Sequence, residues 1–142
     1  MNPSELLIKE IVKKILSEAS QEQKMERDVD KSGIIRIKTS TVKCEPFAQD
    51  GVALKDIVSL QEAPRMGAGV MELDHTSFEW TLTYDEYDMV IEGELEIAIN
   101  GRVIKGAPGD IIYIPKGSHI HFQTPSFARY AYFVYPADWQ KR

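Results

Sequence analysis

Apolar residues near the start of the chain recur at helical spacing and predict a short amphipathic helix over residues 2–19. They form one stripe, which consists of Leu7, Ile8, Ile11, Val12, Ile15 and Leu16. Asn2 suits the N-cap, Pro3 the first helical position and Glu5 the third, as in a variant of the capping box. Residues 20–33 are polar, with few large apolar side chains, and this composition predicts a linker.

The apolar stripe of this helix needs a surface to cover it, because an isolated helix of this length is marginal in water. Three partners remain open from the sequence. The helix docks on the rest of its own chain or on a second subunit, it acts as a detachable targeting peptide, or it binds a membrane surface. Lysine and glutamate both occupy the polar face. This mixture of charges argues against the membrane, for which a lysine-rich face is typical.

From about residue 34 onward the pattern changes to short apolar segments separated by glycine, proline and asparagine, which predicts strands and turns. The expected strands are 34–38, 51–58, 67–73, 78–83, 88–91, 94–99, 102–105, 111–114, 119–122 and 128–135. Apolar and polar residues alternate over 94–99, and Asn100-Gly101 then supplies the residues that a type I′ hairpin turn prefers. Many short strands with regular turns indicate an antiparallel sandwich or barrel. We therefore expect an all-β domain over residues 34–142, preceded by the helix and linker of residues 1–33.

Composition and charge restrict the class of protein. A chain of 142 residues suits one domain, and 43% apolar with 27% charged residues exclude a wholly disordered or collagen-like protein. Seventeen basic against twenty-two acidic residues give a net charge of −5, which argues against nucleic acid as the main partner. The chain has no apolar run of the roughly 20 residues that cross a bilayer, and its opening residues do not resemble a secretory signal. We expect a soluble, cytoplasmic protein without a membrane partner.

Two segments of the expected β domain resemble the two sequence motifs of the cupin superfamily. Residues 86–95 are similar to the first motif, in which an acidic residue, here Glu86, lies seven positions before a glycine, here Gly93. Residues 109–117 are similar to the second motif, in which a glycine is followed after five residues by Pro-x-Gly. The resemblance implies a single jelly-roll β-barrel. It also implies a homodimer, because such barrels are commonly dimeric.

The resemblance does not extend to the metal site of that superfamily. Metal-binding cupins carry two histidines before the acid and one after the Pro-x-Gly turn. The corresponding positions here hold Trp80, Leu82 and Ile120, or Glu79 and Thr81 in place of the first two with the longer spacing. Neutral imidazole gives such sites their affinity for transition metals. We therefore expect no tightly bound transition metal and name no metal ligand.

The histidines and the cysteine of the chain are expected to play no part in such a site. His119 and His121 flank Ile120, so strand alternation is expected to point both side chains away from the barrel interior. His75 lies in a polar turn and is expected to be exposed. Cys44 is the single cysteine of the sequence, which excludes an intrachain disulfide and a site built from several cysteines.

Two acidic residues stand where the metal ligands would otherwise lie. Glu86 and Asp88 are two positions apart, so both side chains point to the same face of a strand, which in cupins is the interior. Tyr84 shares this direction if the strand extends back to it, and Trp80 is expected to form a wall. Two carboxylates in a partly apolar barrel are costly unless they are paired, hydrated or protonated. The candidate counter-charges are Arg65, Arg129 and Lys116.

Two interpretations of these residues remain open. The acids form a functional polar pocket, since buried acids beside hydroxyl groups are typical of acid–base and ligand sites, or they are a structural network inherited from a metal-binding ancestor. For the functional pocket, we predict Glu86, Asp88 and Tyr84 as the catalytic residues. The predicted substrate-binding residues are Trp80, Lys116 and Arg65.

Three further segments are similar to one family of histidine-poor cupins, the EutQ family of ethanolamine utilization proteins. These segments are residues 78–90, 114–118 and the terminal Tyr135-Pro136-Ala137-Asp138-Trp139. The resemblance implies a bacterial protein of ethanolamine catabolism that is associated with a protein-shelled microcompartment. Residues 1–19 then resemble an encapsulation peptide that contacts shell or cargo proteins. The family is also linked to acetate kinase activity, which converts acetyl phosphate and ADP to acetate and ATP.

Two classes of function compete on this evidence. As an acetate kinase, the protein would use Mg²⁺ carried by ATP or ADP, with the acids near the site. The sequence has no GxxxxGK[ST] loop to cradle phosphates, and longer family members carry a larger region before the barrel, where about 33 residues stand here. As a non-enzymatic module, the protein would bind a small ligand or help to assemble the compartment. A cationic phosphate site beside the acids distinguishes the two, because the enzyme alone needs one.

Overall fold

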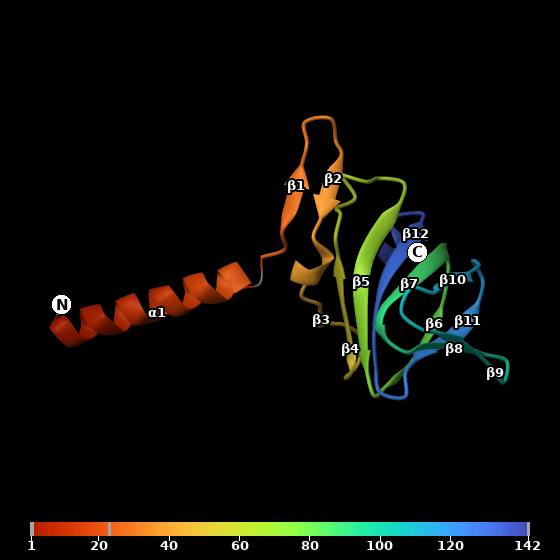
Figure 1. Ribbon diagram of the computed structural model, residues 1–142. Coiled ribbons are helices and arrows are strands. Elements are labelled where there is room, and N and C mark those ends of the chain that lie inside the picture. The colour runs from red at the N-terminus through yellow and green to blue at the C-terminus, as the bar shows by residue number, and fades with distance from the viewer. Residues whose placement is uncertain (1, 23, 142) are drawn as a thin grey trace. The chain divides into compact units, whose positions relative to one another are not determined.

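The computed structural model describes residues 2–22 and 24–141, with the backbone alone for residues 16–22. The chain forms two compact units, Met1–Lys43 and Cys44–Arg142. Figure 1 shows the helix and a hairpin in the first unit and the long strands in the second. Within the described ranges, no helix combines the length and the apolar character that crossing a membrane requires.

The N-terminal unit begins with the predicted helix, α1 (Pro3–Glu22). Its first turn is capped as expected, because the Glu5 backbone N–H donates to Oδ1 of Asn2 at 2.9 Å. The apolar side chains of α1 that the structure describes are exposed within this unit. Leu16, which completes the predicted stripe, belongs to the residues whose side chains are not described.

The predicted linker and the predicted domain boundary are both wrong. A hairpin occupies this region, formed by β1 (Arg27–Val29) and β2 (Ile35–Ile37), and a short 3₁₀ turn, η1 (Thr39–Thr41), follows it. The turn forms because the Asp30 carboxylate accepts from the Ser32 backbone N–H at 2.9 Å and Gly33 takes a φ of 97°. Residues 34–38 therefore pair with β1 rather than with the barrel, and the boundary lies after residue 43.

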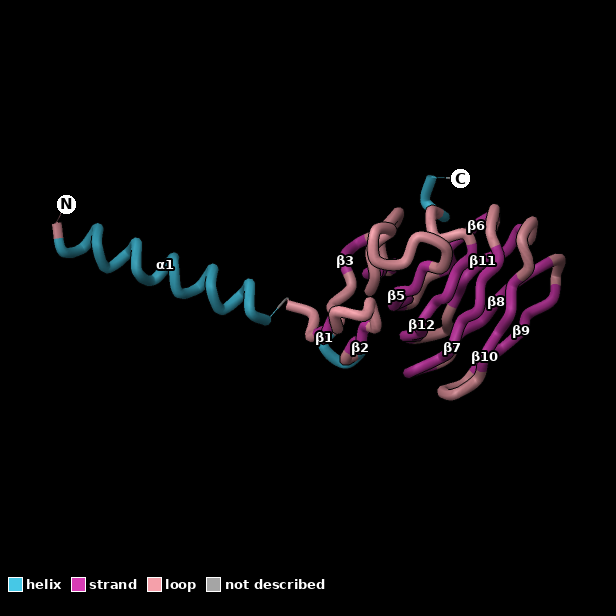
Figure 2. The backbone as a smooth tube through the Cα atoms, turned by 90° about the horizontal axis from the view of Figure 1, so that it is seen from above, coloured by secondary structure: helices cyan, strands magenta, loops and turns pink. Residues whose placement is uncertain are grey.

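The second unit is an antiparallel two-sheet barrel, as predicted. Its elements are β3 (Glu45–Pro46), β4 (Val52–Asp56), β5 (Gly67–Asp74), β6 (Ser77–Thr81), β7 (Asp85–Gly93), β8 (Leu95–Ile99), β9 (Arg102–Gly106), β10 (Ile111–Ile114), β11 (His119–Gln123), β12 (Phe127–Tyr135) and the 3₁₀ turn η2 (Trp139–Lys141). One sheet has the order β10-β7-β12-β5-β4-β3 and the other β6-β11-β8-β9. Figure 2 shows the strands of this unit running side by side. The predicted hairpin is confirmed, since Asn100 and Gly101 have φ of 49° and 77° between β8 and β9.

Strand alternation divides the large sheet into an inner and an outer face. On β7 the residues Glu86, Asp88 and Val90 are buried, whereas Tyr87 and Met89 between them are exposed. The buried residues of β5, β7 and β12 pack against those of β6, β8 and β11 in a single core. β7 begins at Asp85 rather than at the predicted residue 88. This longer strand holds both acids in one regular segment that faces the core.

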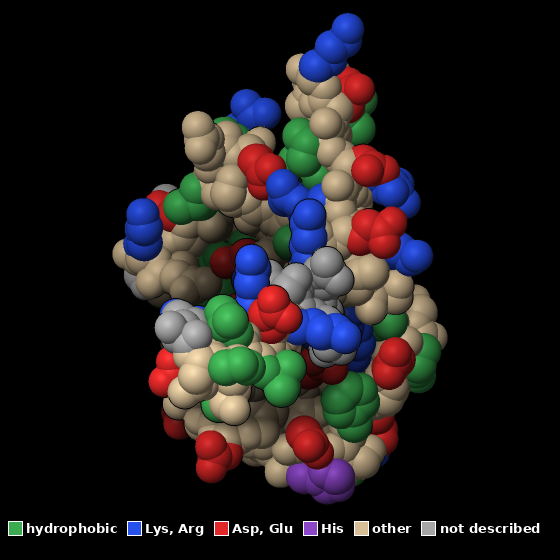
Figure 3. Space-filling model, turned by 90° about the vertical axis from the view of Figure 1, so that its left-hand side faces the viewer, with side chains coloured by type: hydrophobic (Ala, Val, Ile, Leu, Met, Phe, Trp, Pro, Cys, Tyr) green, Lys and Arg blue, Asp and Glu red, His purple; other side chains and the backbone are tan. Residues whose placement is uncertain are grey.

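Both signs of charge occur together on the molecular surface. Figure 3 shows one face, where lysine and arginine side chains lie among aspartate and glutamate side chains.

Candidate functional site: an aromatic cavity with a buried acid pair

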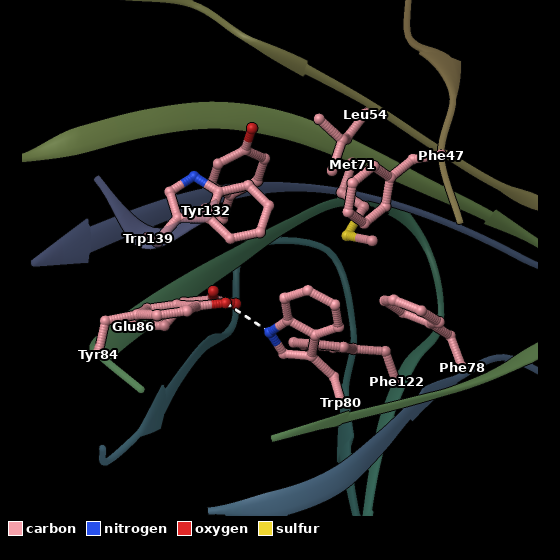
Figure 4. A pocket seen from close by; sticks show the side chains of 10 residues that line it. All are labelled: Phe47, Leu54, Met71, Phe78, Trp80, Tyr84, Glu86, Phe122, Tyr132 and Trp139. Atoms are coloured by element: carbon pink, nitrogen blue, oxygen red, sulfur yellow. Dashed lines mark hydrogen bonds between the residues drawn. The ribbon is translucent and has the colours of Figure 1, made fainter. Parts of the chain in front are cut away.

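A small cavity lies between the two sheets and contains one of the two acids. Its lining residues are mostly aromatic and are Phe47, Leu54, Met71, Phe78, Trp80, Tyr84, Glu86, Phe122, Tyr132 and Trp139. Figure 4 shows these side chains converging on one space, with Glu86 and Tyr84 together at one side. The cavity volume is about 20 Å³, enough for one molecule of the size of water. Among the described residues that line it, Glu86 is the one charged residue.

Aromatic rings make up most of the cavity wall and hold one another in place. The Trp139 ring lies 5.9 Å from that of Trp80, 5.7 Å from that of Tyr84 and 6.0 Å from that of Tyr132, measured between centroids. Tyr132 reaches the cavity because it stands opposite Gly69 on β5, where a Cβ atom would lie 2.1 Å from its ring. The Tyr132 hydroxyl then donates to the Asp56 carboxylate.

The two acids lie side by side on the inner face of β7. Glu86 is 5% exposed and Asp88 is fully buried. Neither carboxyl oxygen of Asp88 has a hydrogen-bond partner among the described residues. Burial raises the pKa of Glu86 to about 7, and burial together with the negative charge of Glu86 raises the pKa of Asp88 well above its ordinary value. The pair is therefore stabilised by holding protons rather than by a cationic partner.

A chain of hydrogen-bonding groups links the aromatic wall to this pair. The Trp80 indole Nε1–H donates to the Tyr84 hydroxyl oxygen at 2.7 Å, as the dashed line in Figure 4 marks. The Tyr84 hydroxyl is in turn within hydrogen-bonding reach of Glu86. Burial, followed by the charge of Glu86, raises the pKa of Tyr84. Tyr84 therefore keeps its proton and can donate it in a hydrogen bond to the Glu86 carboxylate.

The structure thus brings together the predicted residues Trp80, Tyr84, Glu86 and Asp88, but not the predicted cations. Arg65 and Lys116 are exposed and do not line the cavity. Arg129 lies on the outer face of β12, where it forms an ion pair with Glu72 at 3.4 Å. None of the three candidate counter-charges lines the cavity. Strand alternation directs Arg129 outward, and the raised pKa values of the two acids favour their protonated forms.

The positions that hold metal ligands in metal-binding cupins are filled by core residues here. Leu82 and Ile120 are almost fully buried, and Trp80 lines the cavity. His119 is exposed, as predicted, and its Nε2 lies 2.7 Å from the Glu79 carboxylate on the outer face. Among the described residues, no three or more histidine, cysteine, aspartate or glutamate side chains gather closely enough to hold a metal ion. The donor set of the cavity is limited to carboxylate and hydroxyl oxygens.

Several lining residues were not identified from the sequence, chiefly Phe47, Met71, Tyr132 and Trp139. The sequence does indicate Tyr132, because it lies two positions from each of the buried residues Tyr130 and Val134 on β12 and therefore points to the same face. Phe47 and Trp139 lie outside the regular strands, between β3 and β4 and at the start of η2, where no period indicates which way a side chain points.

Comparison with known proteins agrees with this barrel and its N-terminal unit. The model of a family described as "Ethanolamine utilisation protein EutQ" matches residues 3–141. The chain belongs to the EutQ family. An EutQ relative from Clostridioides difficile (strain 630), named "Acetate kinase EutQ", is 43% identical over 97% of this chain and 92% of its own length. A relative of the same name from Salmonella typhimurium is 38% identical over 96% of this chain, which spans 64% of that relative.

Solved structures support the same assignment. The structure of the Clostridium difficile EutQ protein superimposes with a TM-score of 0.79 at 46% identity and covers 83% of this chain and 91% of that one. The cupin domain of a transcriptional regulator from Enterobacter cloacae gives a TM-score of 0.54 at 16% identity and covers 61% and 97% of the two chains. This second likeness shows the fold alone. The EutQ barrel is thus a cupin jelly roll, as the sequence motifs predict.

Proposed function

We propose that this EutQ-family protein is an acetate kinase that transfers a phosphoryl group between acetyl phosphate and ADP. One observation carries the proposal. The Clostridioides difficile relative that bears this name matches nearly the whole of this chain and most of its own length. Both units described above are therefore included in the match. The Salmonella relative is longer, and this chain spans less than two thirds of it.

The acid pair supplies oxygen ligands suited to this chemistry. Phosphoryl transfer depends on Mg²⁺ to neutralise the charge of the phosphates, and Mg²⁺ in such sites takes one or two carboxylates together with water and phosphate oxygens. Glu86 lines the cavity, and Asp88 directly behind it has carboxyl oxygens without a partner among the described residues. These residues would hold the Mg²⁺ that enters with the nucleotide.

ATP formation tests the proposal directly. Purified protein is mixed with acetyl phosphate and ADP, with and without Mg²⁺, and ATP is followed by luciferase luminescence. We expect Mg²⁺-dependent ATP formation by the wild-type protein and at least a tenfold lower rate in Asp88→Asn, because that variant loses one of the two carboxyl groups that would hold Mg²⁺. No ATP formation by folded wild-type protein would refute the proposal. An equal rate in Asp88→Asn would show that the reaction takes place elsewhere.

A second candidate function is a non-enzymatic module that binds a small ligand. One observation favours it: among the described residues, no lysine or arginine lines the cavity, and Arg65 and Lys116 are exposed elsewhere. A kinase without a protein cation must depend on Mg²⁺ alone for charge neutralisation, whereas a small-ligand site need not bind phosphates. Ligand binding without ATP formation in the same preparation would favour this candidate.

We also propose that the protein is a homodimer that contacts its partner through the outer face of β10, β7 and β12. Exposed apolar side chains line up across these neighbouring strands and form one patch of Tyr87, Met89, Ile111, Tyr113 and Phe133. A continuous apolar patch of this kind on a soluble domain is typical of a protein interface. The hydroxyl of Tyr113 donates to Asp85 at 3.0 Å, which holds one side of the patch in place.

The place of the protein in the cell is part of the same proposal. We place it in the cytoplasm, in a bacterial microcompartment, where α1 contacts a shell or cargo protein. Ile8, Ile11 and Ile15 are exposed on the described part of this helix and suit a groove that receives an amphipathic helix. We further propose that the barrel holds no stoichiometric transition metal, since Trp80, Leu82 and Ile120 are poor ligands. Elemental analysis of protein purified without a histidine tag would contradict this if it found one equivalent.

A further inference from the structure

The cavity combines a carboxyl group with aromatic rings in a way that the kinase proposal does not use. Glu86 is 5% exposed and lies at one side of the cavity, beside Asp88 and Tyr84, neither of which is a cation. Among the described residues that line the cavity, none is a lysine or arginine, so the Glu86 carboxylate has no positive partner there.

The remaining walls suit a positive ligand. Aromatic rings surround the cavity, and the Trp139 ring lies within contact distance of three others, those of Trp80, Tyr84 and Tyr132. Ring faces attract cations at centroid distances up to about 6 Å, and tryptophan is the most effective of them. Aromatic walls and a carboxylate together are the chemistry that recognises an organic cation.

We infer that the cavity binds the ammonium group of a small primary amine, with Glu86 as its anionic partner and Trp80 and Trp139 as cation–π partners. The inference concerns ligand binding and holds whether or not the protein is a kinase. The volume of about 20 Å³ fits one water-sized group, and a primary ammonium group is of that size. A quaternary ammonium group with its methyl substituents is too large. An anion such as acetate would meet the carboxylate charge in the same space.

Fluorescence offers a direct measurement, because the chain has two tryptophans, Trp80 and Trp139, and both line the cavity. The full chain is titrated at pH 8 with methylammonium, ethanolammonium and tetramethylammonium chlorides, at ionic strength held constant with sodium chloride. We expect a saturable change in emission with the first two salts and none with tetramethylammonium. Calorimetry under the same conditions provides a second readout that does not depend on the tryptophans.

Three variants test the residues named. Glu86→Gln should weaken binding at least tenfold, and Trp80→Leu should weaken it by a similar factor in calorimetry. Glu92→Gln makes the same chemical change at an exposed position of the same strand and should bind as the wild type does. Unfolding curves establish whether each variant folds.

The wild-type titration decides the inference even if a variant fails to fold. No saturable binding of either primary ammonium salt, equal binding of tetramethylammonium, or equal binding by Glu86→Gln would overturn it. The kinase proposal is tested separately in the absence of amines. A protein that forms ATP but binds no ammonium salt refutes this inference alone, and one that binds ammonium but forms no ATP refutes the kinase proposal alone.

Discussion

Replacing Glu86 by glutamine should stabilise the protein at pH 8 and leave its stability nearly unchanged at pH 4. Burial raises the pKa of this carboxyl from 4.5 to about 7 in the folded protein. Between these two pH values the folded state holds a proton that the unfolded state has released. The free energy of unfolding of the wild type therefore falls as the pH rises through this window. Glutamine resembles the protonated acid in shape and does not titrate, so the free energy of unfolding of Glu86→Gln does not fall in this way as the pH rises.

The size of the effect follows from the two pKa values. A difference of one pKa unit corresponds to 1.36 kcal/mol, so the change from 4.5 to about 7 corresponds to roughly 3 kcal/mol. For a domain the size of this barrel, that difference shifts the melting temperature by roughly 12–24 °C. The negative charge of Glu86 also raises the pKa of Asp88. Glu86→Gln removes this negative charge and so also lowers the cost of ionising Asp88. This second effect likewise stabilises the variant relative to the wild type.

Urea unfolding at pH values from 4 to 8.5 measures this effect, with tryptophan fluorescence as the signal. Glu92→Gln is the matched control, since Glu92 is exposed on the same strand and should show a small, nearly constant difference from wild type. We expect the advantage of Glu86→Gln over wild type to grow from near zero to its full value between pH 4.5 and 7.5. A difference that stays constant with pH, or wild-type stability that rises through this window, would refute the assignment of a buried, proton-holding Glu86.

Three further predictions concern packing, assembly and targeting. Gly69→Ala should destabilise the barrel by about 1–3 kcal/mol in urea unfolding, because the new Cβ would lie 2.1 Å from the Tyr132 ring, and unchanged stability would contradict the packing described. Tyr113→Lys should convert the dimer to a monomer in sedimentation equilibrium, and a wild type that is itself monomeric would refute the proposed interface. A fusion of residues 1–25 to a fluorescent protein should collect in microcompartments, whereas diffuse fluorescence, with a barrel that unfolds when these residues are deleted, would show that the helix is structural.

Much of the barrel could be predicted because its strands carry local signals. Alternation over 94–99 and the Asn100-Gly101 turn determine one hairpin without reference to the rest of the chain. The hairpin of β1 and β2 had no such signal, because strands of three residues are too short to show a period. Its turn at Asp30 and Gly33 lies in a polar segment, and the composition of this segment alone predicts a linker.

Some residues of the candidate site can be predicted from nearby sequence, whereas others are brought to it by the fold from distant parts of the chain. Glu86 and Asp88 are two positions apart on one strand, so their common direction follows from the sequence. The inward direction of Tyr132 follows from alternation on β12, but the pairing of β12 with β7 that brings it beside the acids does not. Trp139 joins them through the turn after β12, where no local pattern shows which way a side chain points. The sequence left open whether the acids are paired, hydrated or protonated. Burial raises the pKa values of both and favours the protonated forms, which local patterns do not reveal.

The central claim is that the Glu86 carboxylate in the aromatic cavity is the functional centre of the protein. The most direct test compares ATP formation from acetyl phosphate and ADP by wild type, Glu86→Gln and Glu92→Gln, at a pH and temperature where unfolding curves show all three folded. The account predicts that Glu92→Gln keeps the wild-type rate and that Glu86→Gln loses at least 99% of it while remaining as stable as wild type or more so. A folded Glu86→Gln variant that forms ATP at the wild-type rate would contradict the claim.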